Sequence, residues 1–253
     1  MTLSLADPRE TIKRLCNDSA IFAFVDRVQN LLNSNPALLC IDCPKDFSAE
    51  HLDHYIESVV RSEAFCEQMF AMDQVFERYA YHWLDMDRYD ATGEIAYVRR
   101  DHEGSWVRRD AVFDLRPMSL EQTRERLIWM LCDARHPYEG NKPNPQYFRH
   151  ERPEAAGIVD AFSESIFRFA GSHFGTSISA MVDNPSSKER IELQKTWHFF
   201  DLAPKFLHNA GYYTVPEPEH THPLAFFEDG DEDTATIFTN GKVIYFLLTN
   251  GSP

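Results

Sequence analysis

Asn240-Gly241 stands between two runs of β-branched and aromatic residues, at 234–239 and 242–248. An Asn-Gly pair in this setting favours a two-residue hairpin turn, because both positions of such a turn require positive φ angles. The pattern predicts an antiparallel β-hairpin over 234–248. Any fold of this chain must therefore provide an antiparallel sheet.

Strand-like runs also occur at 94–100 and 106–115, joined by a loop that contains Gly104. They predict a second antiparallel hairpin over about 94–115. A short apolar run at 37–41, between Pro36 and Pro44, predicts a buried strand. These three segments supply all the strands that we expect.

Apolar residues at helical spacing predict helical structure over most of the remaining chain, at 8–16, 20–32, 48–84, 120–134, 154–174, 187–200 and 202–209. We expect a break or bend within 48–84, because one unbroken helix of that length would be about 55 Å long. Asp7-Pro8, Asp18 or Ser19, Ser48 and Ser119 stand where helix starts are expected. Helices and hairpins lie in separate stretches and do not alternate as βαβ units. The predicted class is therefore α+β, helix-rich, with antiparallel strands.

The length of 253 residues corresponds to one large domain or two small ones. Residues 136–153 contain several prolines and show no periodicity, which is typical of a linker or a surface loop. We predict a single domain over 1–253, with two lobes divided at 136–153 as the alternative.

Acidic residues dominate the charge: 40 Asp and Glu against 25 Lys and Arg give a net charge of −15. Such a chain repels phosphate backbones and anionic membrane surfaces, so we expect neither nucleic acid nor membrane as a partner. The charge favours a basic protein partner or a cation.

No stretch of the sequence approaches the roughly 18 apolar residues of a transmembrane helix. The N-terminal residues show neither the basic nor the apolar region of a signal peptide. Five cysteines are an odd number in a large chain. These features predict a cytoplasmic protein with free thiols.

Cys40-x-x-Cys43 and His51-x-x-His54 together form a candidate zinc site. Two thiolates from a short turn and two imidazoles from one helix face could give tetrahedral coordination. The spacing differs from that of standard zinc motifs. The alternative is two ordinary thiols at a strand end and two solvated histidines.

His220-x-His222, with Glu228 downstream, is a second candidate metal site. On a strand, the two imidazoles would lie on one face, as in catalytic zinc or non-haem iron sites. The alternative is an acidic, proline-rich loop. We expect no cofactor, and zinc is the metal that these two candidate sites would suit.

Residues 217–233 form an acid-rich segment without Lys or Arg. Its acidic residues are Glu217, Glu219, Glu228, Asp229, Asp231, Glu232 and Asp233. They could bind a cationic protein surface or simply solvate a loop. The nearby aromatics could anchor a partner, although core packing is the more common role of such residues. They are Trp197, Phe199, Phe200, Phe206, Tyr212 and Tyr213.

The sequence contains no nucleophile elbow, phosphate loop or dinucleotide fingerprint. Two classes of function remain, and the sequence leaves open whether the protein is an enzyme. The first is an acidic cytosolic binding protein, such as an immunity or inhibitor protein that neutralises a basic toxin or nuclease. The second is a metal-dependent enzyme that uses His220, His222 and Glu228.

Overall fold

The computed structural model describes residues 8–32, 36–43, 51–52, 55, 112–131, 138–139, 142–143, 148–205 and 234–249. The helices are α1 (Pro8–Cys16), α2 (Ser19–Leu32), α6 (Leu120–Met130), α7 (Phe148–Phe169), α8 (Ile178–Asp183) and α9 (Lys188–Thr196). The strands are β1 (Ala37–Asp42), β2 (Val112–Met118), β3 (Tyr138–Glu139), β4 (Lys142–Pro143), β5 (His198–Lys205), β6 (Thr234–Thr239) and β7 (Val243–Thr249).

Five of the strands form one antiparallel sheet in the order β1-β7-β6-β5-β2. Strands β3 and β4 form a separate small hairpin. Helices together with an antiparallel sheet confirm the predicted α+β class. Strand β2 lies at one edge of the sheet and contains Pro117, a residue that sheets tolerate at edges because it has no amide hydrogen to donate.

The hairpin predicted at the end of the chain is present as β6 and β7, but its turn is longer than predicted. Thr239 pairs with Ile244, so four residues separate the last paired positions, not two. Gly241 has a φ of 77°, as predicted. The Asn240 side chain accepts hydrogen bonds from the backbone amides of residues 242–243, at 3.0 and 3.2 Å. The Asn240 side chain thus supplies an acceptor for both of these amides in the longer turn.

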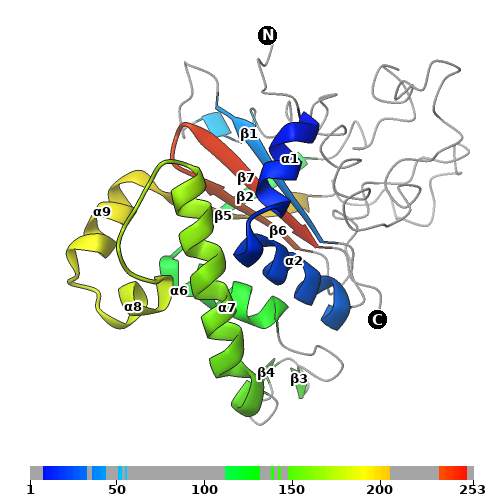
Figure 1. Ribbon diagram of the computed structural model, residues 1–253, viewed down its shortest axis with the longest axis vertical. Helices are drawn as coiled ribbons and strands as arrows, with labels where there is room; N and C mark the ends of the chain where they lie inside the picture. The colour runs from blue at the N-terminus through cyan, green and yellow to red at the C-terminus, as the bar shows by residue number, and fades with distance from the viewer. Residues whose placement is uncertain are drawn as a thin grey trace, which may run out of the picture.

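Helices α1, α2 and α7 pack beside one another over one face of the sheet (Figure 1). The Tyr245 hydroxyl on β7 donates to the Ile166 carbonyl of α7 at 3.5 Å. The rings of Phe24 on α2 and Phe162 on α7 stack with centroids 4.1 Å apart. Strand β7 is therefore covered by α7, which in turn packs against α2.

At strand β7, both faces of the sheet are buried. Ile244, Tyr245, Phe246 and Leu247 are consecutive on β7, so they alternate between the two faces, and all four are fully buried. Buried residues before and after 136–153 belong to one contiguous core. Whether the chain forms one domain or two lobes stays a prediction. Within the described ranges, no helix combines the length and apolar character needed to span a membrane.

Helix starts agree well with the capping signals. Asp18 accepts hydrogen bonds from the amides of Ala20 and Ile21, and α2 begins at Ser19. Ser119 and Gln122 form a capping box at the start of α6. These interactions satisfy amides that would otherwise lack a partner in the first turn of each helix.

The residues around 200 are strand, where the sequence predicted helix. Helix α9 ends at Thr196, and β5 begins at His198 and includes Leu202–Lys205. The predicted helix over 187–200 is therefore confirmed at 188–196 and wrong from His198 onward, and the predicted helix over 202–209 is wrong at 202–205. Pairing with strands on both sides, β2 and β6, outweighs the local helical spacing.

The proline-rich segment 136–153 is also more regular than predicted. It contains β3 and β4, and α7 begins at Phe148 with Pro153 inside the helix. The predicted strands before residue 112, and the predicted helix over 48–84 except residues 51–52 and 55, lie outside the described residues.

Candidate functional site

The thiols of Cys40 and Cys43 are protonated at neutral pH. Burial raises the pKa of the Cys40 thiol to about 12 and that of the Cys43 thiol to about 11. Neither cysteine forms a disulfide bond, and Cys40 is only 6% exposed. A metal or an electrophile reacts with the thiolate, so this environment opposes both kinds of chemistry.

The two thiols also face opposite sides of the sheet. Cys40 pairs with Tyr245 and shares a side-chain hydrogen bond with it, on the face covered by α7. The Cys43 sulfur lies 3.8 Å from the Thr239 hydroxyl. On the other side of β7, Tyr245 pairs with Phe238, so the Phe238 side chain lies on the face covered by α7. Thr239 follows Phe238 in β6, so its side chain lies on the opposite face of the sheet. This arrangement does not bring the two sulfurs toward one ion.

His51 is exposed, and His54 lies outside the described residues. Within the described ranges, no three His, Cys, Asp or Glu side chains gather closely enough to hold a metal ion. A site that involves His54 is untested, so zinc binding stays a prediction.

The second candidate metal site and the acid-rich segment both fall in 206–233, outside the described residues. The structure does place the two ends of this stretch. It leaves from β5 at Lys205 and returns to β6 at Thr234, and these strands are antiparallel neighbours. The connection 206–233 therefore starts and finishes at the same end of the sheet.

The described part of the chain is balanced in charge. Its Lys and Arg residues equal its Asp and Glu residues in number, so the whole net charge of −15 comes from residues outside the described ranges. The longest stretch of acidic residues uninterrupted by Lys or Arg is 217–233.

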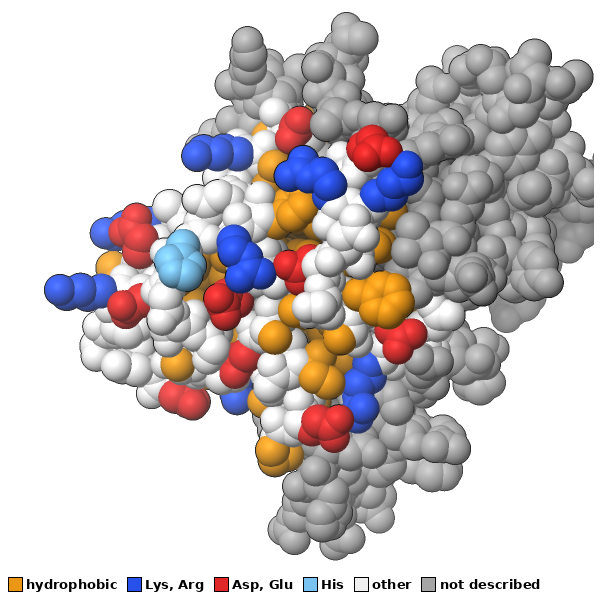
Figure 2. Space-filling view, viewed as in Figure 1, with side chains coloured by type: hydrophobic (Ala, Val, Ile, Leu, Met, Phe, Trp, Pro, Cys, Tyr) orange, Lys and Arg blue, Asp and Glu red, His pale blue; other side chains and the backbone are white. Residues whose placement is uncertain are grey.

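The described arginines are largely engaged by carboxylates of the described helices and strands. Arg126 on α6 donates to Asp201 on β5 at 2.7 Å. The largely buried Arg190 on α9 binds Glu121 of α6 at 2.6 Å and lies 3.3 Å from the Met181 carbonyl. Figure 2 shows basic and acidic side chains interspersed on the visible described surface. Within each of these pairs the two charges neutralise one another.

The aromatic residues singled out in the sequence divide into core residues and undescribed ones. Trp197 is 2% exposed, and its ring lies 4.9 Å from that of Phe167 and 6.4 Å from that of Tyr245. Phe199 is buried, and Phe200 is partly buried. Phe206, Tyr212 and Tyr213 lie outside the described residues. The described members therefore pack in the core.

Sequence reasoning missed a polar position in this core. Ser163 of α7 is 4% exposed, and its hydroxyl has no hydrogen-bond partner. It lines a small cavity between α7 and the sheet. Helical spacing could have revealed it, since Ser163 lies four residues after Val159 and four before Phe167, and both are buried.

No protein-family model matches the sequence, and neither a curated protein nor a solved structure matches the chain.

Proposed function

We propose that this is a cytoplasmic, non-enzymatic binding protein whose acid-rich segment, residues 217–233, docks on a basic protein. A toxin or nuclease with a cationic active site is the class of partner that fits, and the chain would act as its immunity or inhibitor protein. The observation that carries this proposal is the charge distribution.

The described residues are balanced in charge, and several of their arginines pair with nearby carboxylates, whereas 217–233 contains seven acidic residues and no Lys or Arg. Uncompensated charge produces a field that attracts a partner of opposite sign and accelerates its association. Nucleases and other proteins that bind phosphate backbones display a cationic surface. An acidic segment without cations is complementary to it.

The first test is capture from an extract of the native host at low salt, followed by mass spectrometry. The bait proteins are the wild type and a double variant, Asp229→Lys with Asp231→Lys. The matched control is Asp183→Lys with Glu192→Lys, which changes the net charge equally at exposed positions of α8 and α9.

We expect the wild type and the control to capture the same basic protein, and about 0.5 M salt to release it because salt screens the attraction. The Asp229/Asp231 variant should capture much less. Equal capture by that variant at low salt would contradict the proposal. Stoichiometric metal in the purified protein that disappears in His222→Ala would also contradict it and would favour the metal-dependent enzyme.

A further inference from the structure

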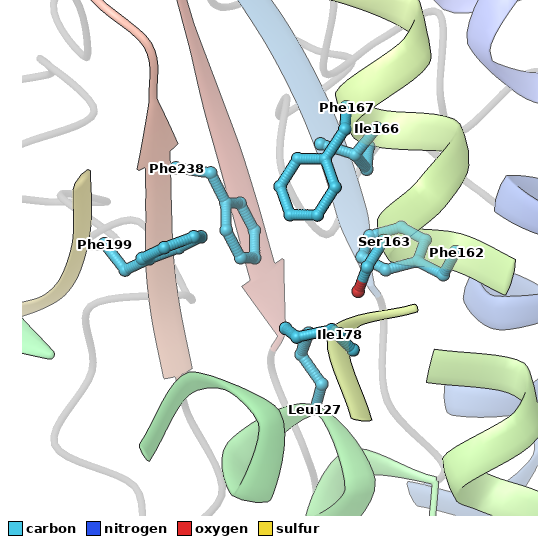
Figure 3. Close-up of a pocket in the computed structure, with 8 residues that line it drawn as sticks. All are labelled: Leu127, Phe162, Ser163, Ile166, Phe167, Ile178, Phe199 and Phe238. Atoms are coloured by element: carbon cyan, nitrogen blue, oxygen red, sulfur yellow. The ribbon is translucent and has the colours of Figure 1, made fainter. Parts of the chain in front are cut away.

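The turn between β6 and β7 is bonded to the C-terminal end of α7. Figure 3 shows Phe238 of β6 and Phe167 of α7 at the same small cavity. Two residues after Phe238, the Asn240 side chain donates a hydrogen bond from Nδ2 to the Ala170 carbonyl, at 3.3 Å. Ala170 directly follows the last residue of α7, where backbone carbonyls have no partner within the helix. Asn240 therefore supplies a donor that the helix itself cannot provide.

The other end of the Asn240 carboxamide is held as well. Its Oδ1 atom accepts from the backbone amides of Lys242 and Val243, at 3.0 and 3.2 Å. Backbone amides can only donate, so the atom that faces them is the carbonyl oxygen, and the NH₂ group faces Ala170. Three hydrogen bonds therefore fix the position of this side chain.

An Asn-Gly pair is prone to deamidation, because glycine has no side chain to obstruct the reacting groups. The Gly241 backbone nitrogen gives up its proton and attacks the Asn240 Cγ atom. A bond forms between these two atoms, the Cγ–Nδ2 bond breaks, and Nδ2 takes up a proton and leaves as ammonia. Water then opens the resulting succinimide ring at either carbonyl, which produces aspartate or isoaspartate.

The closed turn opposes this reaction at both reacting groups. The Gly241 amide donates to the Thr239 hydroxyl at 3.1 Å, which stabilises the protonated nitrogen. Ring closure also requires the Asn240 carboxamide to move toward that nitrogen, and its three hydrogen bonds resist the movement. Gly241 is exposed, so water reaches the site. Hydrogen bonds, and not burial, are therefore the source of the protection.

We propose that Asn240 is a deamidation site that the closed β6–β7 turn holds unreactive, and that its conversion to aspartate releases the turn from α7. The new carboxylate can still accept from Lys242 and Val243, but it cannot donate to the Ala170 carbonyl. It also places a negative charge at the C-terminal end of a helix, where the helix dipole disfavours one. The acid-rich segment takes no part in this reaction, so the proposal is independent of the proposed function.

Timed deamidation of the full chain at mildly alkaline pH tests the protection, once in buffer and once in guanidinium chloride. The sequence contains a second Asn-Gly pair at Asn250, and trypsin separates the two pairs because Lys242 stands between them. Mass spectrometry then follows aspartate and isoaspartate in each peptide, with fragment ions to locate the position.

In denaturant, the two Asn-Gly pairs should react at similar rates, so Asn250 serves as the internal reference. In buffer, Asn240 should react at least about tenfold more slowly than in denaturant, because several hydrogen bonds must break first. Equal rates for Asn240 in the two solutions would overturn the proposal.

Two substitutions of Thr239 test the bond to the attacking nitrogen. Thr239→Val removes the hydroxyl that accepts from Gly241, and Thr239→Ser keeps it. Asn240 should deamidate about fivefold faster in the valine variant than in the serine variant, both in buffer. Equal rates in the two variants would contradict the role of this bond. If the valine variant fails to fold, the wild type in buffer and in denaturant still decides the question.

Asn240→Asp tests the consequence for α7. Its control is Gln194→Glu, which also replaces an amide with an acid, at an exposed position of α9. Hydrogen exchange at the amides of 170–172, which donate to carbonyls of α7, should be about fivefold faster in Asn240→Asp and unchanged in the control. Unchanged exchange in Asn240→Asp would show that the turn stays attached, and would overturn this part of the proposal.

Discussion

Asp18 joins two helices through one carboxylate. One oxygen caps α2 by accepting from the amides of Ala20 and Ile21, and the other lies 3.2 Å from the Arg168 guanidinium on α7. Burial alone would raise the pKa of Asp18, but hydrogen bonds from Ile21, Ser165, Ala20 and Arg168 outweigh it and lower the pKa below 3.8. The carboxylate form therefore stabilises the fold.

We predict that Asp18→Ala lowers the free energy of unfolding by about 1–2 kcal/mol at pH 7, because the cap is lost. Asp18→Asn keeps an acceptor oxygen and should cost less. A lowered pKa gives stability that is present above the unfolded value of 3.8 and is lost as pH falls through the folded value. Urea unfolding should therefore show a smaller difference at pH 3 than at pH 7. Equal stability of Asp18→Ala and the wild type at pH 7 would rule out this role.

Cys40 has the opposite dependence on pH. Burial raises its thiol pKa from 9.0 to about 12, so below pH 9 the thiol is neutral in both the folded and the unfolded chain. Above pH 9 the unfolded chain ionises first, and stability is lost as pH rises toward 12. We predict that, from pH 8 to pH 10.5, the free energy of unfolding of Cys40→Ser falls by about 1–2 kcal/mol less than that of the wild type. Urea unfolding at the two pH values measures both changes. Parallel losses in the two proteins would contradict this assignment.

At the scale of the element, the β6–β7 loop depends on one glycine. Gly241 has a φ of 77°, and apart from its two chain neighbours no atom lies within 4 Å of the position where a Cβ would stand. Backbone strain is therefore the main cost of a larger side chain there. We predict that Gly241→Val lowers the free energy of unfolding by at least about 1 kcal/mol, whereas Gly241→Asn, which tolerates positive φ, costs less. Thermal unfolding of both variants tests this, and a valine variant as stable as the asparagine variant would be inconsistent with it.

Elements with a local start or stop signal were predicted well from the sequence. The capping residues Asp18 and Ser119 mark the starts of α2 and α6, and the strand over 37–41 is bounded by prolines. In each case the signal and the structure lie within a few residues of each other. The positions where these elements begin and end can therefore be predicted from nearby residues alone.

Elements that depend on distant partners were predicted less well. Strand β5 pairs with β2, which is more than 80 residues earlier, and helical spacing alone gave no sign of this. The start of α7 at Phe148 was missed because Pro153 reads as a helix breaker. The helix ends at Phe169, earlier than predicted, where Gly171 adopts a φ of 78° and donates its amide to the Arg168 carbonyl.

At the scale of the whole molecule, composition predicted the charge but not its location. The described helices and strands are neutral in sum, and the net charge of −15 lies in the remaining segments. Topology brings both ends of 206–233 to one end of the sheet, which no local pattern could reveal. Cys40 and Cys43, the cysteines of the candidate zinc site, are a second example. Their spacing in the sequence does not predict that the two thiols lie on opposite faces of the sheet.

The central claim is that the acid of 217–233 draws a basic protein to the chain. The most direct measurement is the association rate constant of the captured partner, by stopped flow, with the wild type and with Asp229→Lys, Asp231→Lys. We predict association slower by on the order of tenfold for the variant at low salt, with the two rates converging at about 0.5 M salt. Thermal stability of the two proteins should be nearly equal, which would separate an effect on association from an effect on folding. Equal association rates at low salt would contradict the claim.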